Sequence, residues 1–158
     1  METQERTVKV FVRIAAILLL LTAGAKLYSA TGAARILSFV DPLTHLRYRT
    51  LMLEMGLLES TVAAYLVFGS GNAPKLWLLF WLSSNFLMYR CASAYLHIHI
   101  CPCMGTVSDA LPLKRGEANF LLLIAVLWLF FGSAFSLMAN LRQRPNGAQV
   151  GGSRVPGG

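Results

Sequence analysis

Four long apolar runs constrain this chain of 158 residues more than any other feature. The run at about 118–140 carries no charged residue, and the runs at about 8–29, 50–69 and 74–97 carry few. A helix needs about 20 apolar residues to cross a bilayer, because it rises about 1.5 Å per residue. A lipid-exposed backbone must also satisfy its own hydrogen bonds. The sequence therefore predicts an all-α fold, an integral membrane four-helix bundle within residues 1–141.

The composition supports a membrane protein and argues against a nucleic-acid partner. Apolar residues make up 56% of the chain and charged residues 13%, and the mean hydropathy is +0.57. A soluble chain of this size has too little interior to bury so much apolar surface. The net charge is +7, but the Lys and Arg residues are scattered over the ends of the runs and the loops. This distribution favours contact with the anionic headgroups of a lipid bilayer.

The first apolar run has two interpretations. Lys9 and Arg13, the apolar stretch Ile14–Leu21 and the small residues Ala23–Ala25 are typical of a cleaved signal peptide. We favour a retained helix, because Lys26 and the two earlier basic side chains can extend toward headgroups. The small residues would then allow a neighbouring helix to approach closely.

Two segments outside the runs are also distinctive. Residues 29–49 predict a short interfacial segment between the first and second helices, broken at Asp41-Pro42 because the residue before proline avoids helical geometry. The tail at 142–158 contains five glycines after Pro145 and has no apolar periodicity, so it is predicted to be disordered.

The distribution of basic residues predicts the orientation. The side that holds both termini has seven Lys and Arg residues, and the other side has five once Lys26 and Arg90, which lie within helices, are left out. The positive-inside rule then predicts cytoplasmic termini and an external loop between the third and fourth helices.

Four charged residues lie within the predicted helices, in the half of the bilayer nearer that loop: Lys26, Glu54, Glu59 and Arg90. A charge at mid-bilayer costs roughly 3 kcal/mol or more, so such residues usually face the bundle and pair. They either hold the helices in register or line a pocket for a quinone headgroup, a proton path or a substrate. Glu59 is predicted to lie deepest.

Two further groups are expected to be structural. Ser83, Ser84 and Asn85 interrupt the third run and are expected to form interhelical hydrogen bonds. Cys91, ten residues before Cys101, is expected to be a buried packing residue, and the alternative is a resolving thiol.

The polar gap after the third run contains the motif His97-Ile98-His99-Ile100-Cys101-Pro102-Cys103-Met104-Gly105. In one interpretation, Cys101 and Cys103 cycle between a dithiol and a disulfide. Cysteines two positions apart can bridge only if the chain bends, so this disulfide would be strained and oxidising. A protonated His97 or His99 would favour the reactive thiolate.

Two other interpretations of the motif remain open. The two histidines and two cysteines could bind zinc or copper, although zinc sites usually draw on pairs with at least two intervening residues. The same residues could also be passive contacts at the membrane surface. We favour thiol chemistry, because cysteine is usually kept for its reactivity rather than its packing.

These residues resemble a known family. The Gly24-x-Lys26-Leu27 sequence, Glu59 within Gly56-Leu57-Leu58-Glu59, and Cys101-Pro102-Cys103-Met104-Gly105 together resemble the methylamine-utilisation MauE and DoxX-like membrane proteins over roughly residues 10–140. The resemblance implies a bacterial inner-membrane protein associated with thiol redox chemistry, with Cys101 and Cys103 as the redox pair. It also implies a link to quinone-coupled oxidation. The chain has no Cys-x-x-Cys sequence of the thioredoxin type.

The sequence therefore predicts a thiol–disulfide exchange protein of the bacterial inner membrane. Its Cys-Pro-Cys loop would face the periplasm, its partner would be a periplasmic thioredoxin-like or client protein, and a quinone is the candidate electron acceptor. The alternatives are a non-enzymatic assembly or anchor subunit and a small zinc- or copper-handling protein.

Overall fold

The computed structural model describes residues 2–32, 35–96 and 115–143. They form helices α1 (Glu2–Thr31), α2 (Tyr48–Phe68), α3 (Asn72–Tyr95) and α5 (Arg115–Gln143), with a short 3-10 helix, η1 (Arg35–Ser38), between the first two. The all-α fold and the four helices are thus confirmed. The His97–Gly105 motif and most of the predicted tail lie outside the described residues.

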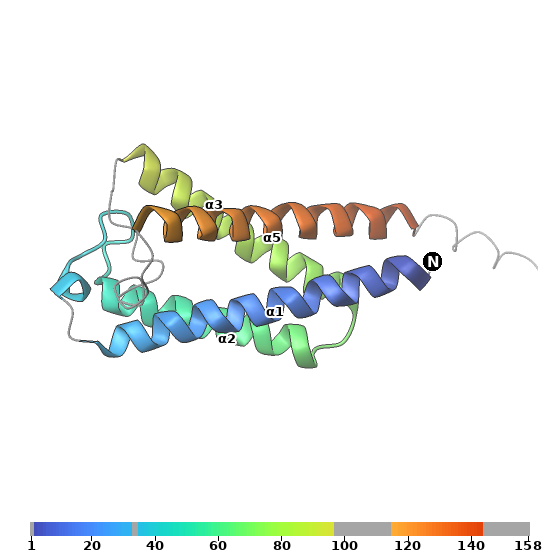
Figure 1. Ribbon diagram of the computed structural model, residues 1–158, viewed down its shortest axis with the longest axis horizontal. Helices are drawn as coiled ribbons and strands as arrows, with labels where there is room; N and C mark the ends of the chain where they lie inside the picture. Colours follow the sequence, from blue (N-terminus) through green and yellow to red (C-terminus); the bar gives the residue numbers. More distant parts are fainter. Residues whose placement is uncertain (1, 33–34, 97–114, 144–158) are drawn as a thin grey trace, which may run out of the picture.

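The four helices form two pairs. Helix α1 packs along α2, and α3 packs along α5, whereas contacts between the pairs are sparse. Figure 1 shows α1 and α2 lying side by side while α3 crosses obliquely beside α5. Successive helices run in opposite directions, so the α1–α2 connection and the end of α3 lie at the same end of the bundle, and the N-terminus and the α2–α3 turn at the other.

Three of the described helices are long and apolar enough to cross a membrane: Glu5–Thr31, Tyr48–Phe68 and Phe120–Asn140. The protein is therefore a multi-pass membrane protein by helix length and hydropathy. The sequence predicted four membrane spans, but α3 does not meet the hydropathy criterion that the other three helices meet. Its 24 residues are sufficient in length, but Lys75, Arg90 and the polar stretch 83–85 lower its hydropathy.

The polar stretch of α3 also corrects a prediction. The hydroxyl groups of Ser83 and Ser84 donate to the carbonyl oxygens of Leu79 and Phe80 at 2.8 and 2.7 Å, and the Asn85 amide donates to Trp81 at 2.8 Å. All of these acceptors belong to α3 itself. The prediction of interhelical hydrogen bonds is therefore wrong for these contacts. Each side chain instead bonds to the carbonyl oxygen one turn earlier in α3, which lies close to it.

The apolar core joins all four helices. Its buried residues include Ala15 and Leu19 of α1, Ala63 of α2, Leu79 of α3 and Leu129 of α5. Buried alanines on α1 and α2 let the two helix backbones approach closely. This close packing stabilises the pair in lipid, where the hydrophobic effect does not drive helices together.

Gly56 marks the closest approach of α1 and α2. A Cβ atom at this position would lie 2.9 Å from the side chain of Leu27 and 3.4 Å from the carbonyl oxygen of Ala23. Ala23 is buried in this contact, as expected from the run of small residues. Gly24, in the same run, faces open space instead, because successive residues of a helix point about 100° apart.

Candidate functional site

A buried ion pair lies within the interface of α1 and α2. Glu59 of α2 is 1% exposed and Lys26 of α1 is 9% exposed. Lys26 occupies the helical face that also buries Leu19 and Ala23, and Glu59 shares its face with Gly56. The charges therefore project into the interface because of their register with the apolar positions.

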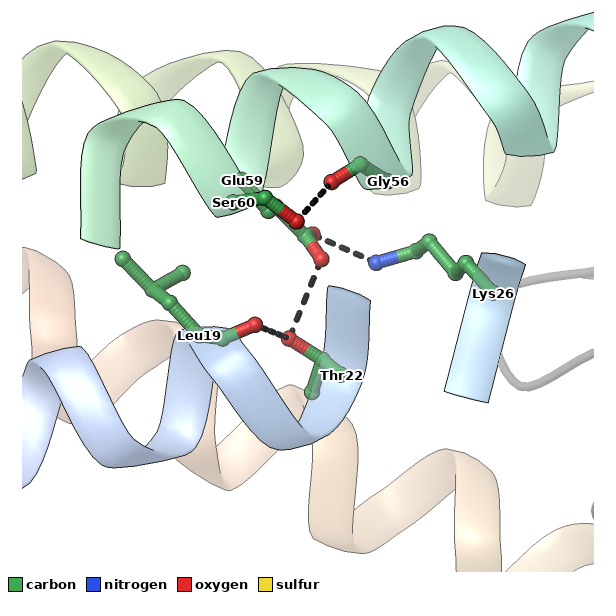
Figure 2. A network of polar contacts seen from close by, with 6 residues as sticks. All are labelled: Leu19, Thr22, Lys26, Gly56, Glu59 and Ser60. Atoms are coloured by element: carbon green, nitrogen blue, oxygen red, sulfur yellow. Dashed lines mark hydrogen bonds and ion pairs between the residues drawn. The ribbon is translucent and has the colours of Figure 1, made fainter. Parts of the chain in front are cut away.

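Both carboxylate oxygens of Glu59 receive hydrogen bonds from α1. The Lys26 ammonium donates to Oε1 and forms a salt bridge with it. The Thr22 hydroxyl lies 3.1 Å from Oε2 and 3.1 Å from the carbonyl oxygen of Leu19. Figure 2 shows Lys26 and Thr22 converging on Glu59, while the neighbouring Ser60 bonds back to Gly56 within α2. A buried ion is tolerated only with such complete pairing.

Helix α3 also reaches the ion pair. The Lys26 ammonium lies 5.2 Å from the centroid of the Phe86 ring, a distance at which an aromatic face attracts a cation. This contact links the first helix pair to the second.

Two cavities lie on either side of this contact. The first, of about 280 Å³, is bordered by all four helices, and the second, of about 420 Å³, lies mainly between α2 and α3. Lys26, Phe86 and Tyr89 border both cavities. These three side chains therefore stand where the two cavities meet.

The two cavities differ in chemistry. The first brings the charged groups of Lys26, Glu59 and Arg90 together. The second is bordered mostly by apolar side chains, with the amide of Asn85 and the hydroxyl of Thr44 as further polar groups. Both cavities are bordered mainly by apolar side chains, and the three charged groups distinguish the first.

A second buried carboxylate, Asp41, lies in the segment between η1 and α2. It is 0% exposed. Its Oδ2 accepts hydrogen bonds from the backbone N–H and the hydroxyl of Thr44 at 2.9 and 2.8 Å. The Tyr89 hydroxyl of α3 donates to Oδ1 at 3.1 Å. His45, in the same turn, adopts a left-handed φ of 56°.

The sequence interpretation treated Asp41 only as a break before proline and missed this role. The signal was present in Asp41-Pro42-Leu43-Thr44, since aspartate followed by proline favours the start of a tight turn. In such turns the aspartate side chain bonds to backbone N–H groups a few residues later. The partner on α3 could not be found from the turn alone.

The structure brings together three of the four predicted membrane charges, Lys26, Glu59 and Arg90, around the first cavity. Glu54 is exposed and borders neither cavity, because five residues rotate it about 140° around α2 from Glu59. Cys91 is exposed as well, so its assignment as a buried packing residue is wrong.

The thiol motif stays a prediction. Cys101 and Cys103, with His97 and His99, lie outside the described residues. Within the described part of the chain, no group of three or more His, Cys, Asp or Glu residues is placed to hold a metal ion.

Comparison of the chain with known protein families, with characterised proteins and with solved structures finds no match. The findings therefore define a four-helix protein with three membrane-length apolar helices.

Proposed function

We propose that this membrane protein exchanges disulfides with a protein partner outside the cytoplasm, using Cys101 and Cys103 as the exchanging pair. The observation that supports the proposal most is the group of three charged residues, Lys26, Glu59 and Arg90, that borders one cavity of the mainly apolar bundle. Ionisable residues inside a membrane generally mark a pathway for protons, ions or a substrate. The resemblance to MauE and DoxX-like proteins supports the same assignment.

The connectivity supports a link between the cavity and the motif. Arg90 precedes the last residue of α3, Tyr95, by five residues, and Cys101 follows it by six. An extended segment of six residues spans at most about 21 Å. The thiols are therefore tethered to the end of the bundle nearer the cavity.

The proposed reaction has two balanced steps. In the first, the Cys101–Cys103 disulfide accepts two electrons from a partner dithiol through a mixed disulfide, which leaves the partner oxidised and the pair as two thiols. In the second, the two thiols pass two electrons and two protons to a quinone of the bilayer, which becomes a quinol while the disulfide re-forms. In this proposal Glu59, which borders the first cavity, accepts and releases a proton.

Thiol trapping tests the proposal. Cells expressing Cys91→Ser protein are alkylated with a mass-tagged reagent with and without prior reduction. We expect reduction to add two tags, and the addition to be lost in Cys101→Ser/Cys91→Ser protein. The Cys91→Ser background is needed because Cys91 is exposed and would take up a tag in both samples. Fully reduced cysteines under all conditions would refute the exchange.

One observation favours a second candidate, an assembly or anchor subunit without chemistry. Both carboxylate oxygens of Glu59 accept hydrogen bonds from residues of α1. The same contacts are expected if Glu59 only holds the two helices together. In that case the trapping experiment shows no disulfide, and no zinc or copper copurifies. Copurified metal would instead support the metal-handling alternative.

A further inference from the structure

Two neighbouring cavities beside Lys26 offer space for a small molecule. Their volumes of about 280 and 420 Å³ fall, together, within the 300–1,000 Å³ typical of small-molecule sites. Because Lys26, Phe86 and Tyr89 border both, a ligand that reaches the ion pair from the second cavity passes along the faces of these three side chains.

The second cavity suits a hydrocarbon chain. It is bordered by Leu51, by Trp81 and by three methionines, Met52, Met55 and Met88. Methionine is unbranched and polarisable, so it adapts to ligands of variable shape. Helices α2 and α3 make few contacts with each other, which leaves the space between them to these side chains.

Lys26, which borders both cavities, suits a hydrogen-bond acceptor. An ammonium group carries three donors and no acceptor. Lys26 gives one to Oε1 of Glu59 and presents its charge to the face of Phe86, which leaves donor capacity toward the cavities that it borders. A carbonyl or carboxylate oxygen satisfies such a donor in a low-dielectric site.

We propose that the space beside Lys26 binds a single-chain amphiphile whose carbonyl-bearing head meets Lys26 and whose hydrocarbon chain lies in the second cavity along Met52, Met55 and Trp81. The head can belong to a quinone or to a fatty acid, since both present a carbonyl oxygen on a long apolar chain. This site shares residues with the proposed function but does not require thiol exchange.

Quenching of tryptophan fluorescence tests the site. In the reporter protein, Trp77 and Trp128 are replaced by phenylalanine, so that Trp81 beside the second cavity is the sole tryptophan. In the control protein, all three tryptophans are replaced and Phe135→Trp supplies the fluorophore. Phe135 is 74% exposed on α5. It lies about as many residues from the end of α5 as Trp81 lies from the start of α3, and both of these helix ends are at the end of the bundle that holds the N-terminus. Both tryptophans therefore report general partitioning of a probe into the detergent or bilayer.

Three probes distinguish a quinone head, a fatty-acid head and a hydrocarbon chain without a head. They are a decyl benzoquinone, a dibrominated stearic acid, and a dibrominated alkane without a head. We expect the quinone, the acid or both to quench Trp81 at about a tenfold lower concentration than the Phe135→Trp control, a difference of about 1.4 kcal/mol. The alkane should quench the two proteins alike. Equal quenching by all three probes, or no selective quenching of Trp81, would overturn the proposal.

Two sets of variants assign the binding to the named residues. Lys26→Met/Glu59→Met removes the charges together at similar volume, a change that buried ion pairs often tolerate, and should abolish the preference for probes with a carbonyl head. Ala92→Phe fills the second cavity and should weaken binding at least about tenfold. Ala64→Phe adds the same side chain on an exposed face of α2 and should leave binding unchanged.

The outcomes also separate this site from the proposed function. Selective quenching in Cys101→Ser/Cys103→Ser protein supports the amphiphile site even when thiol trapping fails. Loss of selective quenching in that protein would show that the site depends on the cysteines, and would overturn the inference as stated here.

Discussion

The two buried carboxylates of this protein, Glu59 and Asp41, are satisfied in different ways. Glu59 lies in the interface of α1 and α2 and takes its hydrogen bonds from α1. Asp41 lies in a connecting segment, and its hydrogen-bond partners include Thr44 of its own turn and Tyr89 of α3. The first joins two helices that already pack closely. The second joins the two helix pairs where other contacts are few.

This difference indicates what each contact does. Removing a partner of Glu59 leaves an unpaired charge in a tightly packed interface, so the main effect should be a lower free energy of unfolding. Breaking the Asp41 cluster removes one of the described links between the pairs, so the main effect should be on how α3 sits against α1 and α2, and hence on the cavities between them.

The largest expected effect is that of Lys26→Met alone. The substitution leaves Glu59 buried without its countercharge and should lower the free energy of unfolding by about 3–5 kcal/mol. Titration with a denaturing detergent measures the change. Lys26→Met/Glu59→Met should recover most of it. Lys9→Met, which removes an exposed ion pair at 3.7 Å, should cost less than about 1 kcal/mol. A double variant as unstable as the single one would show that packing, not charge, dominates.

Gly56→Ala should have the next largest effect. The added Cβ would lie 2.9 Å from Leu27, so α1 and α2 must separate or Leu27 must shift, at a cost of about 1–3 kcal/mol. Gly24→Ala is the matched control, since nothing lies within 4 Å of its Cβ position. Alanine there should stabilise α1 by up to about 1 kcal/mol. The same detergent titration compares the two variants, and equal effects would argue against a close approach at Gly56.

Tyr89→Phe tests the link between the pairs. It removes the hydroxyl that bonds to Asp41 and keeps the ring, so the loss of stability should be about 1 kcal/mol. We also expect hydrogen exchange of α3 amides near Tyr89 to speed up, while amides of α1 near Glu59 change little. Uniform acceleration in both helices would mean that the two clusters act as one unit.

Glu54→Gln should have the smallest effect. Glu54 is exposed and lies away from both cavities, so the free energy of unfolding should change by no more than about 0.5 kcal/mol. A larger loss, measured beside the Lys26 variants, would place Glu54 in a contact with a partner molecule.

Many residues of the candidate site could be predicted from the sequence, but not their arrangement or their contacts. The long apolar runs located the helices, and the cost of a charge in lipid singled out Lys26, Glu59 and Arg90. The same reasoning included Glu54, because both glutamates lie in one apolar run and differ only in the direction that they face. It also missed Asp41, whose partner on α3 is 48 residues away in the sequence.

The sequence by itself determined the class of this protein, since apolar runs of about 20 residues have the length of membrane-spanning helices, and three of the described helices meet that standard. It also determined which side chains are costly to bury. Only the tertiary structure decided which of them meet, that the polar residues of α3 bond within their own helix, and that two cavities lie beside Lys26. Those outcomes depend on the rotation and crossing of whole helices, and packing across all four sets these at once.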